Sequence, residues 1–210
     1  TVSTSLYERP CMNLSSSISS QESRSALRQT GLTAIMPVSQ DSPEFRRSLQ
    51  ALLDADDPAD EVILVCDGFE AKSLQLANTK LQVLQTPNQQ GPAAARNLGA
   101  SKAKYKILCF IDADVEIRKD CFTHIKRTFA TAPALTAVFG SYDDAPEKPG
   151  IVSQFRNLLH HHVHQHSAQE AQTFWAGLGA IKTREFLAFG GFDAHRFAKP
   201  SIEDIELGYR

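Results

Sequence analysis

A pair of aspartates, Asp112 and Asp114, directly follows an apolar run from Tyr105 to Ile111 in this 210-residue sequence. Such a run predicts a buried strand, and side chains at i and i+2 of an extended segment project to the same side. Two crowded carboxylates repel each other unless a cation lies beside them, and Mg²⁺ or Mn²⁺ prefers carboxylate oxygens together with substrate phosphates. The spacing therefore predicts a divalent-metal site, and the alternative is a strand-end turn that carries solvated acids.

The elements that must position these aspartates belong to an α/β fold, in which short strands alternate with helices around a mostly parallel sheet. Amphipathic helices are expected behind Pro43 and behind Asp120, where apolar residues recur at helical spacing, and another helix is expected to begin at Pro92. Ligands of such sheets bind beyond the carboxyl ends of the strands. Strands are expected at Leu32 to Val38, Glu61 to Cys66, Leu81 to Gln85, Tyr105 to Ile111 and Leu135 to Gly140.

Composition limits the possible partners. The formal net charge is −2, so the sequence does not predict a surface for binding nucleic acid. The four cysteines occur singly, which predicts neither a structural zinc nor a disulfide framework and favours a cytoplasmic location. No apolar run approaches the roughly 20 residues that span a bilayer, so membrane association is expected to use sequence outside these residues. Nothing predicts an oligomeric state.

Two segments stand apart from the α/β pattern. Residues 1–30 are Ser-rich with few apolar residues, which predicts a flexible leader before a domain at residues 31–210. Five histidines lie between Leu159 and Ser167, some of them at the i, i+4 spacing that can bind a metal on a helix. No acid or cysteine completes such a site, and histidines on helices are usually solvated or packed. A cationic, amphipathic segment near an acceptor or a lipid surface fits these residues better than a metal site does. These histidines are His160, His161, His162, His164 and His166.

Seven segments, taken in order, resemble the motifs of glycosyltransferase family 2. The resemblance covers about Leu32 to Arg210 and implies the GT-A fold, a Rossmann-like three-layer α/β/α arrangement, truncated here at its C-terminal end. It implies an inverting glycosyltransferase that uses a nucleoside-diphosphate sugar, with a UDP-sugar as the first guess, and a saccharide or lipid-linked acceptor. The segments are A-I-M-P-V (34–38), E-V-I-L-V-C-D-G (61–68), G-P-A-A-A-R-N-L-G-A (91–100), F-I-D-A-D (110–114), W-A-G-L-G-A (175–180), G-G-F-D (190–193) and E-D-I-E-L-G-Y-R (203–210).

The resemblance assigns donor-side roles to particular residues. Pro37 and Asp67 are expected to line the nucleoside pocket, and Asp67 to meet the base. Arg96 is expected to contact the base or to hold Asp67, and its alternative role is that of a surface helix residue paired with a neighbouring acid. Asp112 is expected near the ribose and the water shell of the metal, while Asp114 is expected to ligate Mn²⁺ or Mg²⁺ directly.

The resemblance also assigns acceptor-side roles. Asp204 is expected to be the base that takes the proton of the attacking hydroxyl, with Glu203 orienting the acceptor or the helix. The same acids also fit the first turn of a helix with Ser201 as its N-cap. Trp175 and the small residue Gly177 suit a sugar that stacks on an aromatic face, and the alternative is an aromatic side chain that fills the core.

Two departures from the family pattern concern the donor base. Ser39 and Gln40 stand where the family commonly has an aromatic residue and Asn, and the chain has C-D-G-F (66–69) where the family commonly has D-D-G-S. Two other functions fit part of the sequence. A haloacid-dehalogenase-like phosphatase would use Asp112 as its nucleophile, and a non-catalytic or truncated nucleotide-binding module would keep the pocket without the reaction.

Overall fold

The computed structural model describes residues 2–5, 31–70, 81–142 and 173–210, which include a six-stranded sheet. The strand order is β4-β3-β2-β5-β9-β7. The first four strands of that order are parallel to one another, whereas β9 is antiparallel to both β5 and β7. The expected mostly parallel sheet is therefore confirmed. Its strands are β2 (Leu32–Val38), β3 (Glu61–Asp67), β4 (Leu81–Thr86), β5 (Ile107–Ile111), β7 (Ala137–Phe139) and β9 (Leu178–Lys182).

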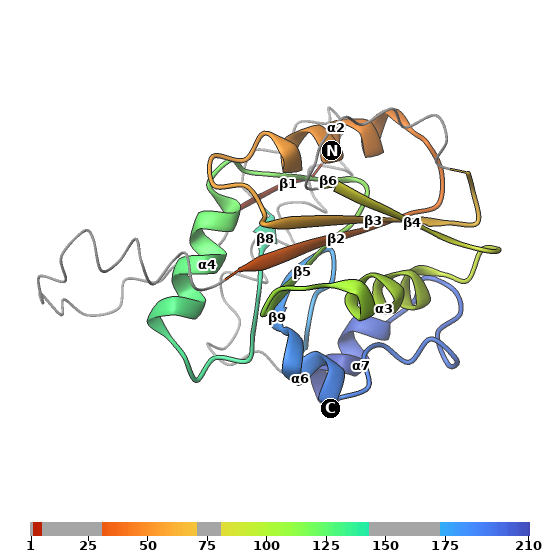
Figure 1. Ribbon diagram of the computed structural model, residues 1–210. Helices are drawn as coiled ribbons and strands as arrows, with labels where there is room; N and C mark the ends of the chain where they lie inside the picture. The colour runs from red at the N-terminus through yellow and green to blue at the C-terminus, as the bar shows by residue number, and fades with distance from the viewer. Residues whose placement is uncertain (1, 6–30, 71–80, 143–172) are drawn as a thin grey trace, which may run out of the picture.

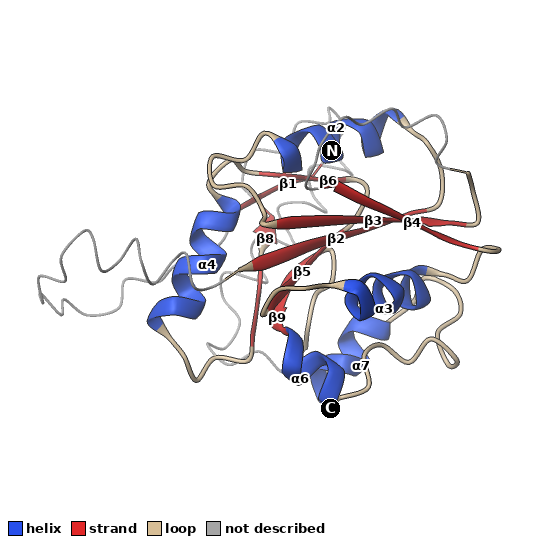
Figure 2. Ribbon diagram, in the orientation of Figure 1, coloured by secondary structure: helices blue, strands red, loops and turns tan. Residues whose placement is uncertain are grey.

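Helices cover both faces of this sheet, as Figures 1 and 2 show. One face carries α2 (Pro43–Leu53) and α4 (Cys121–Thr131), whose buried apolar side chains belong to one cluster. The other face carries α3 (Pro92–Lys102), α6 (Thr183–Ala188) and α7 (Glu203–Tyr209), whose buried apolar side chains belong to a second cluster. The result is the expected three-layer α/β/α arrangement.

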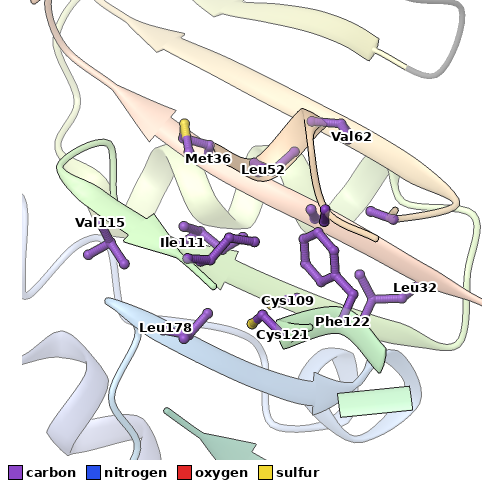
Figure 3. Packing of buried hydrophobic residues seen from close by; sticks show 14 of the residues in the cluster. Leu32, Met36, Leu52, Val62, Cys109, Ile111, Val115, Cys121, Phe122 and Leu178 are labelled. Carbon is purple, nitrogen blue, oxygen red and sulfur yellow. The ribbon is translucent and has the colours of Figure 1, made fainter. Parts of the chain in front are cut away.

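Strand β5 shows why the sequence is continuously apolar before the two aspartates. Cys109 and Ile111 face the α2–α4 side, while Leu108 and Phe110 face the α3–α7 side. Alternate side chains of a strand point to opposite faces, so a strand covered on both sides needs apolar residues at every position. Figure 3 shows the first cluster, which includes Cys109, Ile111 and Phe122. In the second cluster, Phe110 packs against Phe174, Phe186 and Phe192, with ring centroids 5.1–6.4 Å apart.

Local signals position the two helices that follow β2 and β4. The Ser42 hydroxyl accepts a hydrogen bond from Phe45 N at 3.1 Å, and Pro43 occupies the first turn of α2. Pro92 likewise begins α3, in which Ala93 and Ala95 are fully buried. Small side chains let α3 pack closely on the sheet, which brings its first turn to the carboxyl ends of the strands.

Some expected elements differ in the structure. Val2–Ser5 form β1, which pairs with β6 (Val115–Ile117) and β8 (Ser141–Tyr142), so these four residues of the expected leader belong to a strand, and the flexible leader stays a prediction. The rest of residues 1–30 lies outside the described residues, as do the histidines between Leu159 and Ser167. Strand β5 begins at Ile107 rather than Tyr105, and β7 is shorter than expected. Within the described ranges, no helix has both the length and the apolar character to cross a membrane.

Candidate functional site

The two aspartates lie on a turn that connects β5 to β6. Val115 N donates to Asp112 O at 3.0 Å, which closes the turn, so the expectation that Asp112 and Asp114 lie on an extended segment is wrong. The β5–β9 ladder ends with the pair Ile111 and Leu178, and the chain turns as soon as this pairing stops. Burial raises the pKa of Asp112, and repulsion from the nearby Asp114 carboxylate adds to this rise.

A buried arginine on α3 bridges two acids of this site. Arg96 Nη2 donates to Asp112 Oδ1 at 2.6 Å, and Nη1 donates to Glu203 Oε1 at 2.8 Å. The side chains of Arg96 and Glu203 are only 5% and 6% exposed, whereas that of Asp112 is 37% exposed. The expectations that Arg96 holds Asp67 or lies on the surface are therefore wrong. It lies on the buried side of α3, where it needs acidic partners.

The charges around Asp112 leave the site strongly acidic. Burial raises the pKa of Asp112, the Arg96 guanidinium opposes this rise, and Asp114 and Asp204 add to it. Burial lowers the pKa of Arg96, but Asp112 and Glu203 outweigh burial and raise it. Two carboxylates, those of Asp112 and Glu203, bind the guanidinium, and those of Asp114 and Asp204 also act on Asp112, so the acids outnumber the one cation, which is an arrangement that attracts a further cation.

The expected base, Asp204, lies beside a backbone segment that also contacts Asp112. Ala176 N donates to Asp204 Oδ2 at 3.2 Å, and Ile205 N donates to Asp204 Oδ1 at 2.8 Å. Asp112 N in turn donates to the carbonyl oxygen of Gly177 at 3.0 Å. Two consecutive residues, Ala176 and Gly177, thus join Asp112 to Asp204 through main-chain atoms.

The helix that carries Asp204 begins differently from the expected N-cap arrangement. Its N-cap is Ile202 rather than Ser201. Ser201 N instead donates to Glu203 Oε2 at 3.0 Å, so the Glu203 side chain reaches back over the start of α7 while its other oxygen binds Arg96. The acids are in the first helical turn, as expected.

Asp67 is buried at the end of β3, where its carboxylate fixes the loop that leads to α3. It accepts hydrogen bonds from Thr86 Oγ1, Gln90 N and Gly91 N, each at 2.8 Å. Gly91 has a φ of +91°, and a Cβ atom there would lie 2.3 Å from the carbonyl oxygen of Ala198, so only glycine fits. The contact of Asp67 with a nucleotide base stays a prediction.

Pro37 lies on β2 next to the end of β3, where it is opposite Val65. The ladder between β2 and β5 ends at the pair Ile35 and Phe110, so Pro37 lies beyond the last pair of that ladder. A proline, which lacks an N–H group, fits a strand at such a position. Pro37 and Asp67 are thus brought to the same edge of the sheet.

Trp175 lies against the backbone of Gly177, whose carbonyl oxygen accepts the hydrogen bond from Asp112 N. A Cβ atom on Gly177 would lie 2.5 Å from Trp175 Cζ2, so the indole lies directly over this glycine. The indole is half-buried and packs against the α2–α4 cluster. It fills part of the core and leaves part of its surface exposed, so sugar stacking on Trp175 stays a prediction.

The oxygen atoms of Asp112 and Asp114 fit a divalent cation that is shared with a phosphate. Among the residues that the structure describes, no three His, Cys, Asp or Glu side chains converge as a full ligand set. Mg²⁺ and Mn²⁺ in phosphate sites commonly use one or two carboxylates and take their remaining ligands from phosphate and water. The acidic turn has this chemistry.

Comparison with known proteins identifies the family. The family model described as Glycosyl transferase family 2 matches residues 33–185, well over half of the chain. The chain belongs to glycosyl transferase family 2. An uncharacterized glycosyltransferase of Haemophilus influenzae is 33% identical over 95 residues, covering 42% of this chain and 38% of the relative. A pre-mycofactocin glycosyltransferase of Mycobacterium tuberculosis is 32% identical over 92 residues, covering 42% of this chain and 18% of the relative.

Solved structures of glycosyltransferases share the GT-A fold of this family 2 domain. The mannosyltransferase PcManGT from Pyrobaculum calidifontis, in complex with GDP-Man and Mn²⁺, has a TM-score of 0.61 at 19% identity, covering 89% of this chain and 56% of that chain. TarS 1-349 of S. aureus, in complex with UDP-GlcNAc, also has a TM-score of 0.61 at 19% identity, covering 85% of this chain and 52% of that chain. The chain thus spans little more than half of either protein, and less than half of the two relatives above.

In the sequence of this family 2 domain, the spacing of residues on α3 indicates that Arg96 is buried. Ala93, Arg96 and Ala100 recur at i, i+3 and i+7, which places the arginine on the apolar face of its helix. A charged residue on such a face requires buried partners of opposite charge. The bridge from Arg96 to Asp112 and Glu203 could have been sought on this ground, although the sequence does not say which acids would meet it.

Proposed function

We propose that residues 31–210 form the donor-binding and catalytic part of an inverting glycosyltransferase, which moves a sugar from a nucleoside-diphosphate donor to an acceptor hydroxyl. One observation carries the proposal: Asp112 and Asp114 lie on the turn after β5, and Asp204 is joined to Asp112 through the backbone of residues 176 and 177. Membership of glycosyl transferase family 2 supports this reaction class.

The nucleoside is proposed to bind at the edge formed by Pro37 and Asp67. Ser39 and Gln40, which follow β2, are exposed and carry no aromatic ring for a base to stack on. The similar structures were solved with donors of two different bases, GDP-Man and UDP-GlcNAc, so the fold alone does not select the base. A UDP-sugar remains the first donor to test.

The acidic turn is proposed to face the diphosphate of the donor. Mn²⁺ or Mg²⁺ bound by Asp114, with Asp112 as its helper, would supply positive charge beside the departing diphosphate. The Mn²⁺ in the mannosyltransferase complex supports this choice of metal. Arg96 and the Gly177 carbonyl hold Asp112 in a fixed orientation at the turn.

Asp204 is proposed to take the proton of the acceptor hydroxyl. As this proton leaves, the hydroxyl oxygen attacks the anomeric carbon, the bond from that carbon to the phosphate oxygen breaks, and the bonding electrons leave with the nucleoside diphosphate. A single displacement of this kind inverts the configuration of the sugar. The N–H groups of Ala176 and Ile205 orient the Asp204 carboxylate for this step.

The acceptor is proposed to be a saccharide or a lipid-linked saccharide. The exposed part of Trp175 offers an aromatic surface for a sugar ring. Glu203, next to the base, holds the start of α7 through Arg96 and the Ser201 amide. Contact with a membrane surface, through the segment around His160 to His166 or through other sequence, belongs to the same proposal.

A thermal-shift screen tests the donor side directly. UDP and GDP are added with and without Mn²⁺, because a ligand that binds only the folded state raises the melting temperature. Asp114→Asn should abolish the Mn²⁺-dependent part of the shift, whereas Asp56→Asn, at an exposed aspartate on the α2–β3 connection, should keep it. The absence of any Mn²⁺-dependent shift with either nucleotide would contradict the proposal.

Turnover of the donor separates an enzyme from a non-catalytic module. Release of nucleoside diphosphate from UDP-sugars is measured with a panel of saccharide acceptors. Asp204→Asn should remove turnover and leave the Mn²⁺-dependent thermal shift unchanged, because Asp204 acts on the acceptor. Binding without turnover in the unmodified domain would instead support the nucleotide-binding module.

A further inference from the structure

Arg96 connects the donor side of the proposed site to its acceptor side. Its two terminal nitrogens bind different carboxylates: that of Asp112, at the end of β5, and that of Glu203, at the start of α7. Glu203 directly precedes the proposed base, Asp204. One guanidinium therefore lies between the acid that faces the donor and the helix that carries the base.

The hydrogen bonding of Arg96 differs from that of an arginine paired with a single carboxylate. Its Nε atom is buried and has no hydrogen-bond partner among the described residues, which is uncommon for a buried donor. A fork-to-fork pair with one carboxylate would use Nε together with one terminal nitrogen. Arg96 instead spans two carboxylates, and the ring of Phe192, 5.5 Å from the guanidinium carbon, covers it.

Lys126 provides a comparison within the same protein. It is also buried, with a side chain 5% exposed, and it binds Asp57 at 3.0 Å and the carbonyl oxygen of Pro58 at 3.0 Å. Its partners belong to the loop between α2 and β3, and none of them belongs to the proposed site. Lys126 thus has the burial and the acidic partner of Arg96 without the connection to Asp112 or α7.

We propose that Arg96 is a positioning residue that couples occupancy of the donor site at Asp112 to the stability of α7 and of its base, Asp204. The inference rests on the proposed function. A cation that approaches Asp112 weakens the attraction between Asp112 and Arg96, and the guanidinium then binds Glu203 more strongly. The start of α7 is therefore more stable when the donor is bound, and Asp204 is held in position while the donor is present. Linkage makes the effect reciprocal.

Hydrogen exchange of the backbone amides of Glu206 to Arg210 tests this coupling without a turnover assay. Exchange is compared with and without Mn²⁺ plus UDP, and in parallel with Mn²⁺ plus GDP. In the unmodified protein, the bound nucleotide should slow exchange in α7 by about fivefold or more, the lower end of ordinary coupling between two sites. Absence of binding with both nucleotides would overturn the proposed function and this inference together.

Three variants separate coupling from general stability. Arg96→Met removes the bridge, and the double variant Arg96→Met/Glu203→Gln also removes the carboxylate that would otherwise be left buried and unpaired. Lys126→Met is the matched control, because it also removes a buried cation from its acidic partners. We expect exchange in α7 to change less than twofold in both Arg96 variants when they are saturated with Mn²⁺ and nucleotide, and Lys126→Met to keep the full slowing.

Three results would overturn the inference and leave the proposed function standing. Exchange in α7 of the unmodified protein could stay unchanged although the nucleotide binds. The slowing could persist in Arg96→Met/Glu203→Gln, in which case the backbone link through Ala176 and Gly177 carries the coupling. Lys126→Met could lose the slowing as completely as the Arg96 variants, in which case the effect is general destabilisation.

Discussion

The variant Asp67→Asn tests whether the Asp67 carboxylate stabilises the folded protein in addition to any contact with a nucleotide. Both oxygens of Asp67 accept hydrogen bonds within the protein, from Thr86 and Gln90 at Oδ1 and from Gly91 at Oδ2. An asparagine can accept with one oxygen only. If that oxygen keeps Thr86 and Gln90, its NH₂ group faces the N–H group of Gly91, and two donors meet.

The expected cost follows from these contacts. A hydrogen bond to a charged acceptor contributes about 1.5–3 kcal/mol, and a buried donor left without a partner costs about 1–3 kcal/mol. The two effects overlap at Gly91, so the free energy of unfolding should fall by about 2–4 kcal/mol. For a protein of this size each kcal/mol lowers the melting temperature by about 2–4 °C, so a fall of roughly 4–16 °C is expected.

Urea and thermal unfolding of the ligand-free protein measure this effect, and Asp114→Asn is the matched control. Asp114 is exposed at the same edge of the sheet and makes no hydrogen bond through its side chain to another described residue. Its substitution should leave stability within about 0.5 kcal/mol, as for other exposed positions. A ligand-free Asp67→Asn protein as stable as the control would refute the structural role of Asp67.

Three further predictions concern single residues. Since burial raises the pKa of Asp112, protons compete with a cation there at a higher pH than at an ordinary aspartate, and the Mn²⁺-dependent thermal shift with UDP should shrink as the pH is lowered; a constant shift would contradict this. Burial raises the pKa of Cys66 to about 11 and that of Cys121 to about 12, so iodoacetamide should alkylate both thiols only after unfolding, as peptide mass spectrometry can show. Gly177→Ala should displace the indole of Trp175, the only tryptophan, and shift its fluorescence to longer wavelength, whereas an unchanged spectrum would argue against this contact.

The strands and helices with local signals were predictable from the sequence. Strand β2 has the expected bounds, and α2 begins with the expected proline behind a serine that caps it. The strand before the two aspartates was predictable because both of its faces are covered and every position is therefore apolar. The acids Asp112, Asp114 and Asp204 were also predicted, through the order of their motifs along the chain.

The missed features depend on partners that are distant in the sequence. Strand β9 has the sequence L-G-A-I-K (178–182), whose small residues give a weak strand signal, and its antiparallel pairing with β5 supplies what the local sequence does not. The partner of Arg96 on α7 lies 107 residues away along the chain. The loop that Asp67 fixes depends on the register between β3 and β4, which sequence periodicity does not define.

The link through Ala176 and Gly177 has a consequence for how substrate range could change during evolution. Asp112 N donates to the carbonyl oxygen of Gly177, and Ala176 N donates to the Asp204 carboxylate, so the dipeptide takes part in this link only through main-chain atoms. Side chains elsewhere around the site can therefore be exchanged without removing this link. In a glycosyltransferase, that arrangement would let acceptor preference diversify while the reaction geometry stays constant.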